Sequence, residues 1–461
     1  MQWKRFRGCA GVLRGHDERV LHELLRIPVT GTPLLVPVYV LAAVLAGWVL
    51  VGPVHERRRL RRAAVRVGAA LVGVAVGLGA VWWTGDVQDD FGVQFTPVTR
   101  MWVAFAFAGV ALLLVVAVQG GWLARIVAVA AAGALVLSAG LGVNVDFGFY
   151  KDVEQAIATN PYRTKALPLV PDPRSGPVVD AAGWHAPAGM PSKGETISVT
   201  IPGRVSHFRA RRAVVWLPPA AQVAHAPRLP VLVALSGQPG QPADMFQTGD
   251  LGGFLDRYAA AHHGLAPIVV SPDQLGAPNR NPMCVDSRRL GRSATYVVTD
   301  TVQWIEHHLP VASGPRAWGV LGFSEGATCA MQFSTEHPDV FGAALAISSE
   351  LAPITGDAQA STALAFGGSA AAYRAAAPVA VMAAHGPYRD HLTVFGYGQD
   401  DAPYRASTEA LHAAAVRAGM QTQVIVSPGS AHDWNTVRYV LANGLPAVLA
   451  HLGLPRTEGA L

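Results

Sequence analysis

The stretch that decides the fold is "AWGVLGFSEGATCAMQFSTEH", residues 317–337. Its apolar first part predicts a buried strand and its last part predicts a helix. Between them Gly322, Ser324 and Gly326 form a G-x-S-x-G pattern, of which this composition gives about 0.2 matches by chance. A nucleophile elbow needs this strand–turn–helix context, because the sharp turn leaves no room for side chains at the glycines. A serine that merely caps a helix is the alternative, and the stretch alone does not separate the two.

Two further stretches supply partners for Ser324. A serine hydroxyl becomes nucleophilic when a histidine takes its proton and a carboxylate orients that histidine. With this elbow, the acid follows a later strand and the histidine lies near the end of the domain. In "HLTVFGYGQDDAPY" (391–404), Asp400 and Asp401 follow a predicted strand, and in "VIVSPGSAHDW" (424–434), His432 follows the last one. The order and the loops predict a catalytic set of Ser324, His432 and one of the two aspartates.

An oxyanion hole requires two backbone N–H groups that point at the developing negative charge. One is expected from Glu325, which follows the serine, and the other from the loop "ALSGQPGQPADMF" (234–246), where Gln238 is the candidate. An ordinary Gly/Pro turn is the alternative for this loop. The sequence shows no His, Cys and Asp cluster with metal-ligand spacing, so neither a metal nor another cofactor is expected.

Around the elbow, short apolar runs alternate with helical stretches. The predicted strands are 195–202, 213–217, 230–235, 267–271, 317–321, 343–348, 391–397 and 421–427, and predicted helices include 294–309 and 404–418. From the third strand onward the runs are continuously apolar, as expected for strands covered on both faces. Strands that alternate with helices predict a doubly wound, mostly parallel sheet of eight strands.

The first third of the chain has a different composition. Hydrophobic residues make up 51% of the 461 residues, charged residues 15%, and the mean hydropathy is +0.29. Four runs, 27–54, 67–85, 101–124 and 126–145, contain no charged residue. Each is long enough to cross about 30 Å of hydrocarbon at about 1.5 Å per residue. They predict four transmembrane helices, the alternative being buried helices of a soluble protein.

Charge suggests which side of the membrane the rest of the chain faces. Four crossings put both ends on one side, and the loop "HERRRLRRAAVR" (55–66) holds six Arg, which the positive-inside rule places in the cytoplasm. The N-terminal tail holds six Lys and Arg as well. Arg125 adds one charge to the side of the loop and Arg100 adds one to the side of the tail, so the two sides tie at seven each. The denser loop favours an extracytoplasmic C-terminal domain. Residues 151–461 carry a net charge of −1, which gives no support to nucleic-acid binding.

These observations divide the chain into four parts. They are a basic N-terminal tail (1–30), a four-helix transmembrane region (31–145), a Pro- and Gly-rich linker (146–193) and an α/β domain (194–461).

From about residue 195 to 452 the sequence resembles the esterase family of α/β-hydrolases, which includes esterase D and the antigen-85-like mycolyltransferases. The resemblance is carried by "GFSEGATCA", "CVDSRRLGRSATYVVTDTVQWIEHHL", "FGGSAAAYRAAAP", "FGYGQDDAPY" and "AHDWNTVRYVL". The four apolar runs, the Arg-rich loop and "VNVDFGFYKDVEQAI" are similar to membrane-anchored members from mycolate-making actinobacteria. In those relatives the hydrolase domain lies outside the membrane, which breaks the tie in the charge count.

The resemblance implies a role for each candidate residue. Ser324 corresponds to the nucleophile, His432 to the general base, and the N–H groups of Gln238 and Glu325 to the oxyanion hole. The relatives' G-x-x-D spacing from Gly398 selects Asp401 over Asp400. Members commonly carry cysteines in "CVDS" and "GATCA", which implies a disulfide between Cys284 and Cys329, the alternative being two buried thiols. The loop "LSGQPG" lacks the Asp-Gly start and the trehalose-contacting residues of the mycolyltransferases, and the tail 1–30 is longer than expected.

The sequence thus predicts a multi-pass cell-membrane protein that displays an esterase outside the cytoplasm and forms an acyl-enzyme on Ser324. The expected substrate is an acyl ester, such as a lipid or envelope ester. One alternative is an acyltransferase of the mycolyltransferase type that moves the acyl chain to a sugar or envelope hydroxyl. Another is a non-catalytic binding protein of the same fold. The sequence does not indicate the acyl chain, the acceptor or the oligomeric state.

Overall fold

The chain forms two compact units, Met1–Pro161 and Tyr162–Leu461. The computed structural model describes residues 25–51, 59–88, 95–156, 161–165 and 176–457. The basic tail predicted over 1–30 lies almost wholly outside the described residues.

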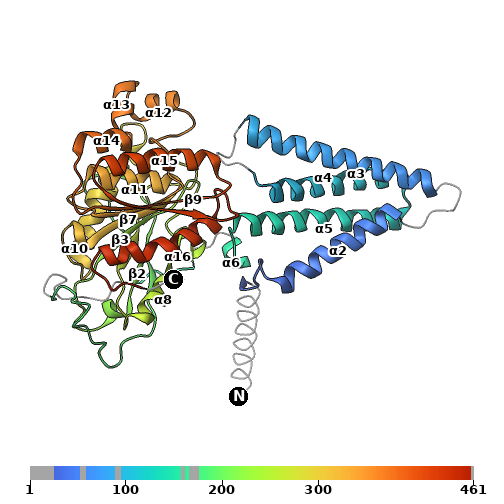
Figure 1. Cartoon of the computed structure of the whole chain (residues 1–461). Helices are drawn as coiled ribbons and strands as arrows, with labels where there is room; N and C mark the ends of the chain where they lie inside the picture. The colour runs from blue at the N-terminus through green and yellow to red at the C-terminus, as the bar shows by residue number, and fades with distance from the viewer. Residues whose placement is uncertain (1–24, 52–58, 89–94, 157–160, 166–175, 458–461) are drawn as a thin grey trace, which may run out of the picture. The chain divides into compact units, whose positions relative to one another are not determined.

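The first unit is helical (Figure 1). Its elements are α2 (Thr32–Val51), α3 (Arg59–Val81) with the π-helical turn η2 (Trp82–Val87), α4 (Pro97–Gln119), α5 (Trp122–Phe147) and the short α6 (Val153–Ala156). The four long helices match the four predicted apolar runs, and each is long and apolar enough to cross a membrane. α3 begins at Arg59, before the predicted apolar run, because arginine is a good helix former.

Local sequence sets the ends and the packing of these helices. Thr96 caps α4 by accepting a hydrogen bond from the N–H of Thr99 at 3.1 Å. Gly73 and Gly77 of α3 face α4, where a Cβ on Gly73 would lie 2.7 Å from the carbonyl oxygen of Phe107. Small residues at this spacing let two helix backbones approach closely, as is common between helices in membranes.

Polar contacts gather at one end of the helical unit. Arg100 at the start of α4 forms a two-pronged ion pair with Asp86 of η2, at 2.7 and 2.8 Å. The Thr99 hydroxyl donates to Asp146 at the end of α5, at 2.6 Å. Only 11 to 33% of each apolar helical stretch is buried inside the protein. The remaining apolar surface is what a helix presents to lipid.

The second unit contains one large sheet. Its strands are β1 (Glu195–Val199), β2 (Ala213–Leu217), β3 (Val231–Leu235), β4 (Ile268–Ser271), β7 (Trp318–Phe323), β8 (Ala343–Ile347), β9 (Leu392–Gly398) and β10 (Gln421–Ser427). The spatial order is β1-β2-β4-β3-β7-β8-β9-β10. The first two pairings, β1 with β2 and β2 with β4, are antiparallel, and all later ones are parallel. These eight strands confirm the predicted mostly parallel α/β sheet.

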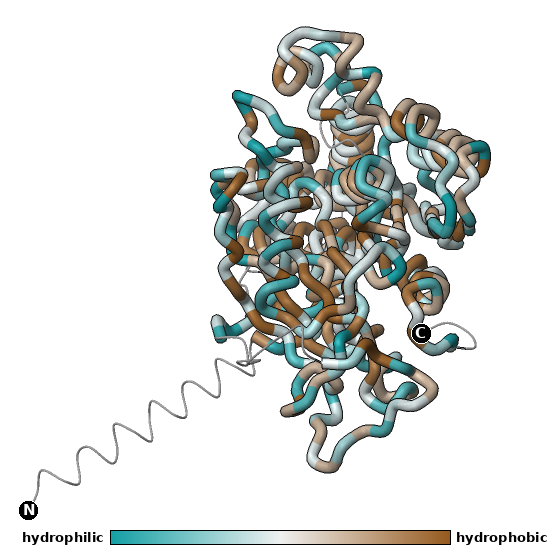
Figure 2. Tube along the Cα trace, turned by 90° about the vertical axis from the view of Figure 1, so that its left-hand side faces the viewer, coloured by the Kyte–Doolittle hydropathy of each residue, from teal (hydrophilic) through white to brown (hydrophobic). Residues whose placement is uncertain are grey.

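Helices cover both faces of the sheet. They are α7 (Asp244–Gln247), α8 (Leu251–Ala261), α9 (Ser293–Thr295), α10 (Val302–His308), α11 (Glu325–Glu336), α12 (Ala358–Ala365), α13 (Ala370–Ala375), α14 (Pro378–His385), α15 (Ala402–Arg417) and α16 (Trp434–His451), with the turns η3 (Pro219–Gln222), η4 (Tyr296–Thr301) and η5 (Pro315–Ala317). α8 and α16 pack on one face, and α11, α14 and α15 on the other (Figure 1). Figure 2 shows hydrophobic segments of the chain in the interior of this unit, where the buried core residues lie.

Three features differ from the sequence-based expectations. A short hairpin of β5 (Asp286–Ser287) and β6 (Gly291–Arg292) was not predicted, because two-residue strands leave no hydrophobic period. β10 is mostly exposed, since it forms the sheet edge. Part of the predicted linker 146–193 packs on the second unit, where Thr164 bridges to Ser198 and Val178 to Arg228.

Candidate active site

The G-x-S-x-G stretch forms a tight turn between β7 and α11. Ser324 has φ 56° and ψ −122°, a backbone conformation that is strained for a residue with a side chain. A Cβ on Gly322 would lie 2.2 Å from the carbonyl oxygen of Gly326, and one on Gly326 would lie 2.4 Å from that of Leu235. Both positions therefore require glycine. The strain and the close approach are those of a nucleophile elbow.

The Ser324 side chain contacts a histidine across the site. Its Oγ lies 2.9 Å from Nε2 of His432, a hydrogen-bond distance. Ser324 occupies the N-cap position of α11, yet its side chain makes no capping hydrogen bond to that helix, all of which the structure describes. The geometry therefore favours the nucleophile over the helix-cap interpretation.

A buried aspartate lies behind the histidine. Nδ1 of His432 is 3.2 Å from Oδ2 of Asp401, which also accepts a hydrogen bond from the Ser348 hydroxyl at 3.2 Å. Asp401 is 3% exposed, whereas the side chain of Asp400 is exposed at the surface. The structure therefore brings Asp401, and not Asp400, to the histidine.

Two aromatic rings hold the imidazole between them. Phe323 stacks on His432 with ring centroids 4.8 Å apart, and Tyr404 stacks at 4.0 Å. Ser348 and Tyr404 are site residues that the sequence did not identify. Tyr404 lies in the quoted stretch 391–404, but no pattern there indicates stacking on a histidine from another loop.

The two candidate oxyanion donors belong to two segments that lie next to the serine. Glu325 is the first residue of α11, and the first N–H groups of a helix have no partner within it. The loop after β3 also lies close to the serine, since a Cβ on Gly237 would lie 3.3 Å from Cβ of Ser324. Gln238 follows directly, so the structure places both predicted segments beside the serine.

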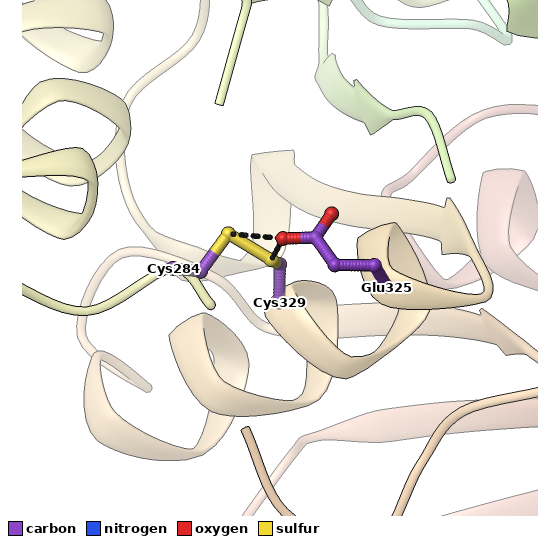
Figure 3. Close-up of side chains that lie close together, drawn as sticks. All are labelled: Cys284, Glu325 and Cys329. Atoms are coloured by element: carbon purple, nitrogen blue, oxygen red, sulfur yellow. Dashed lines mark hydrogen bonds between the residues drawn. A yellow bond between two sulfur atoms is a disulfide. The ribbon is translucent and has the colours of Figure 1, made fainter. Parts of the chain in front are cut away.

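The Glu325 side chain is buried and lies against a disulfide (Figure 3). Cys284 and Cys329 form this bond, with their Cα atoms 5.4 Å apart. Oε1 of Glu325 lies 3.0 Å from the sulfur of Cys329 and 3.6 Å from that of Cys284. These three side chains resemble a metal-binding set, but bonded sulfurs are not the thiolates that bind metals.

A hollow lies near the first residues of β7, β8 and β9, at the opposite end of these strands from Ser324. It has a volume of about 500 Å³ and is lined by Arg316, His385 and Asp390, among others. β7, β8 and β9 begin near it and end near Ser324, so it is not part of this site.

Comparisons with known proteins agree with the fold and the elbow. A family with the description "Putative esterase" matches residues 208–439. The chain is 30% identical to an uncharacterized protein of Corynebacterium glutamicum over 415 residues, which cover 88% of this chain and 93% of that protein. This coverage takes in helices of the first unit as well as the esterase region.

Solved structures similar to the second unit include a ferulic acid esterase, 19% identical with a TM-score of 0.48, over 56% of this chain and 98% of that one. An S-formylglutathione hydrolase from Agrobacterium tumefaciens is 18% identical with a TM-score of 0.47, over 56% and 95% of the two chains. The family match spans half of the sequence and includes the elbow. The chain belongs to this esterase family of α/β-hydrolases and is an enzyme of the serine-hydrolase class.

Proposed function

We propose that this protein is a membrane-anchored esterase that cleaves acyl esters on the extracytoplasmic side through an acyl-enzyme on Ser324. The observation that carries the proposal is the continuous contact from Ser324 Oγ through His432 to Asp401 on a strained elbow. A fold kept only for binding would not need this order of hydroxyl, imidazole and buried carboxylate.

The reaction follows from the positions of these groups. Ser324 Oγ attacks the ester carbonyl carbon while its proton passes to Nε2 of His432, and Asp401 stabilises the imidazolium that forms. The N–H groups of Gln238 and Glu325 bind the oxyanion. The C–O bond then breaks, the alcohol leaves with the proton from His432, and the acyl group stays on Ser324. A water molecule, deprotonated by His432, releases the acid by the same steps.

The anchor supports a lipid or envelope ester as substrate. Four apolar helices in the same chain hold the esterase unit close to a bilayer, where such esters are concentrated. A sugar acceptor is less well supported, since the loop at Gln238 lacks the residues with which mycolyltransferases contact trehalose. Hydrolysis is therefore the favoured outcome for the acyl-enzyme.

Two features support an extracytoplasmic site. Arg61 and Arg62 lie near the start of α3 and Arg125 near the start of α5. Asp86, which pairs with Arg100, and Asp146 lie where these helices finish. The positive-inside rule puts the arginines in the cytoplasm and the aspartate end, which leads to the esterase unit, outside. The disulfide of the esterase unit also fits an oxidising compartment.

Labelling with a fluorophosphonate probe tests the proposal. The full-length protein in detergent should be labelled, and Ser324→Ala should lose both the labelling and the hydrolysis of short p-nitrophenyl esters. Ser334→Ala, which changes a buried serine of the same helix, is the matched control and should still be labelled. Labelling of Ser324→Ala equal to wild type would contradict the proposal. Product analysis with and without a sugar acceptor then separates hydrolysis from acyl transfer.

A further inference from the structure

The two halves of the candidate oxyanion hole belong to different elements. Gln238 lies in the loop after β3, and Glu325 begins α11. Stabilisation of an oxyanion depends on both N–H groups being held in place before the charge develops. A small displacement of one half against the other lowers the rate even when each half keeps its own fold.

One buried side chain connects these two halves. Gln274, in the loop after β4, is completely buried. Its amide nitrogen donates to the carbonyl oxygen of Ser236 at 2.6 Å and to Oε2 of Glu325 at 3.0 Å. Ser236 lies two residues before Gln238, so a single amide group links the oxyanion loop to the side chain of the other donor residue.

The surroundings of Gln274 fix it in place. The backbone carbonyl oxygen of Gln274 accepts a hydrogen bond from the Ser293 hydroxyl at 2.6 Å. The neighbouring Asp273 pairs with Arg211 at 2.6 and 2.9 Å, and Arg211 donates to the carbonyl oxygen of Gly240 at 2.9 Å. The β4 loop is thus connected to the oxyanion loop on both sides of Gln238, directly at Ser236 and through Arg211 at Gly240.

The contacts of Glu325 indicate that its carboxyl group carries a proton. Oε2 accepts the hydrogen bond from Gln274, while Oε1 faces the two sulfurs of the disulfide (Figure 3). A disulfide sulfur has no hydrogen to donate, so a hydrogen bond in the 3.0 Å contact with Cys329 has the carboxyl group as its donor. A neutral acid satisfies both contacts, and a carboxylate would leave Oε1 without a donor there.

The electrostatics agree with a neutral acid. Burial, reinforced by the negative charges of Glu350 and Asp273, raises the pKa of Glu325 to about 8, although the hydrogen bond from Gln274 opposes the shift. Asp273 is paired with Arg211, and Glu350 accepts a hydrogen bond from the Thr328 hydroxyl.

We propose that Gln274 and the protonated side chain of Glu325 are positioning residues that clamp the two halves of the oxyanion hole together. The disulfide contacts the Glu325 carboxyl group and holds it in place. This inference rests on the proposed function. The side chains act through the backbone N–H groups, so they affect the transition state more than the bound ester, and their loss lowers kcat more than it raises KM.

Kinetics of the full-length protein with a short p-nitrophenyl ester test the clamp. Glu325→Ala and Gln274→Ala should each lower kcat roughly tenfold to hundredfold, which does not exceed the decrease in kcat caused by removing one oxyanion donor. The KM of each variant should stay within about threefold of the wild-type KM. The double variant should be little worse than either single one, because both changes break the same link. Glu325→Gln, which retains an N–H toward the sulfur and an oxygen toward Gln274, should recover most of the kcat lost in Glu325→Ala.

The pH profile gives a readout that a purely structural role would not change. In wild type kcat should fall as the pH rises through about 8, where Glu325 ionises. Glu325→Gln cannot ionise and should lack this decline, while Glu336→Gln, at the far end of α11, should retain it together with the basal activity. Melting curves and thiol titration confirm that each variant is folded with its disulfide intact.

Two results would overturn the inference: a kcat of Glu325→Ala equal to wild type, or the same alkaline decline in Glu325→Gln. Ser324→Ala measured in parallel separates the two proposals. If it remains active, the proposed function itself fails. If it is inactive while the Glu325 and Gln274 variants behave as wild type, only the clamp is wrong.

Discussion

At the scale of single residues, Asp400 and Asp401 show how neighbours in sequence take different environments. Asp401 is 3% exposed and contacts His432, whereas Asp400 is exposed and contributes its N–H to the carbonyl oxygen of Ser430. That backbone bond helps to hold the histidine loop against the end of β9. Adjacent residues at the end of a strand point in different directions, so only one of two carboxylates can reach the imidazole.

This difference gives a prediction for the triad acid. Asp401→Asn should lower kcat/KM by roughly 10³- to 10⁴-fold, because an amide does not stabilise the imidazolium or hold the required tautomer. Asp400→Asn, the matched control, should stay within about twofold of wild type. Steady-state hydrolysis of a p-nitrophenyl ester measures both, and equal losses in the two variants would contradict the assignment.

The buried Glu325 also predicts a pH dependence of stability. Its pKa is raised from 4.5 to about 8 in the folded protein, chiefly by burial. Between these values the folded state holds a proton that the unfolded state has lost, so the free energy of unfolding falls as the pH rises. The melting temperature of Glu325→Gln relative to wild type should therefore increase from pH 5 to pH 8. A difference that does not change with pH would show that Glu325 titrates normally.

At the scale of elements, the elbow helix α11 is fixed at both its first residue and its second turn. Ser324 and Glu325 begin the helix at the site, and Cys329 attaches it to the loop that carries Cys284. A disulfide between residues separated by 45 positions restricts the unfolded chain as well as the folded one.

Removal of this disulfide should therefore destabilise the esterase unit. The double variant Cys284→Ala/Cys329→Ala is expected to lose about 2 to 4 kcal/mol of unfolding free energy, visible as a lower melting temperature of the full-length protein in detergent. Cys9→Ala is the control, because it leaves the disulfide intact. An unchanged melting temperature of the double variant would argue that the two cysteines are reduced in the native protein.

At the scale of the whole molecule, four apolar helices and an esterase unit occupy one chain. The helices leave most of their apolar surface exposed, which fits a lipid environment. Arginines lie near the starts of α3 and α5, and the predicted orientation rests on the dense arginine loop 55–66, because the Lys and Arg counts of the two sides are equal.

The orientation can be measured with reporter fusions in cells. Alkaline phosphatase, which is active only outside the cytoplasm, should be active when fused at the C-terminus and inactive when fused at residue 60. A cytoplasmic reporter such as green fluorescent protein should give the opposite pattern. A C-terminal fusion that is active only with the cytoplasmic reporter would place the esterase unit inside the cell.

The sequence alone determined the main strands, the long apolar helices and the elbow of this protein. The eight strands, the four long helices and the turn at Ser324 follow from local periodicity, apolar length and paired glycines, which act within a few residues of one another. Ser324 and His432, a pair that the structure brings within hydrogen-bond distance, were indicated by their order and loops.

Only the tertiary structure decided which side chains meet. Tyr404 stacks on His432, and Gln274 links Ser236 to Glu325, so these contacts join residues 28 to 51 positions apart. The position of Asp401 beside His432 separates it from its neighbour Asp400. Such contacts depend on how strands and helices are arranged in three dimensions, and local sequence patterns do not record that arrangement. The neutral state of Glu325 likewise arises from the burial and the disulfide that the fold places around it.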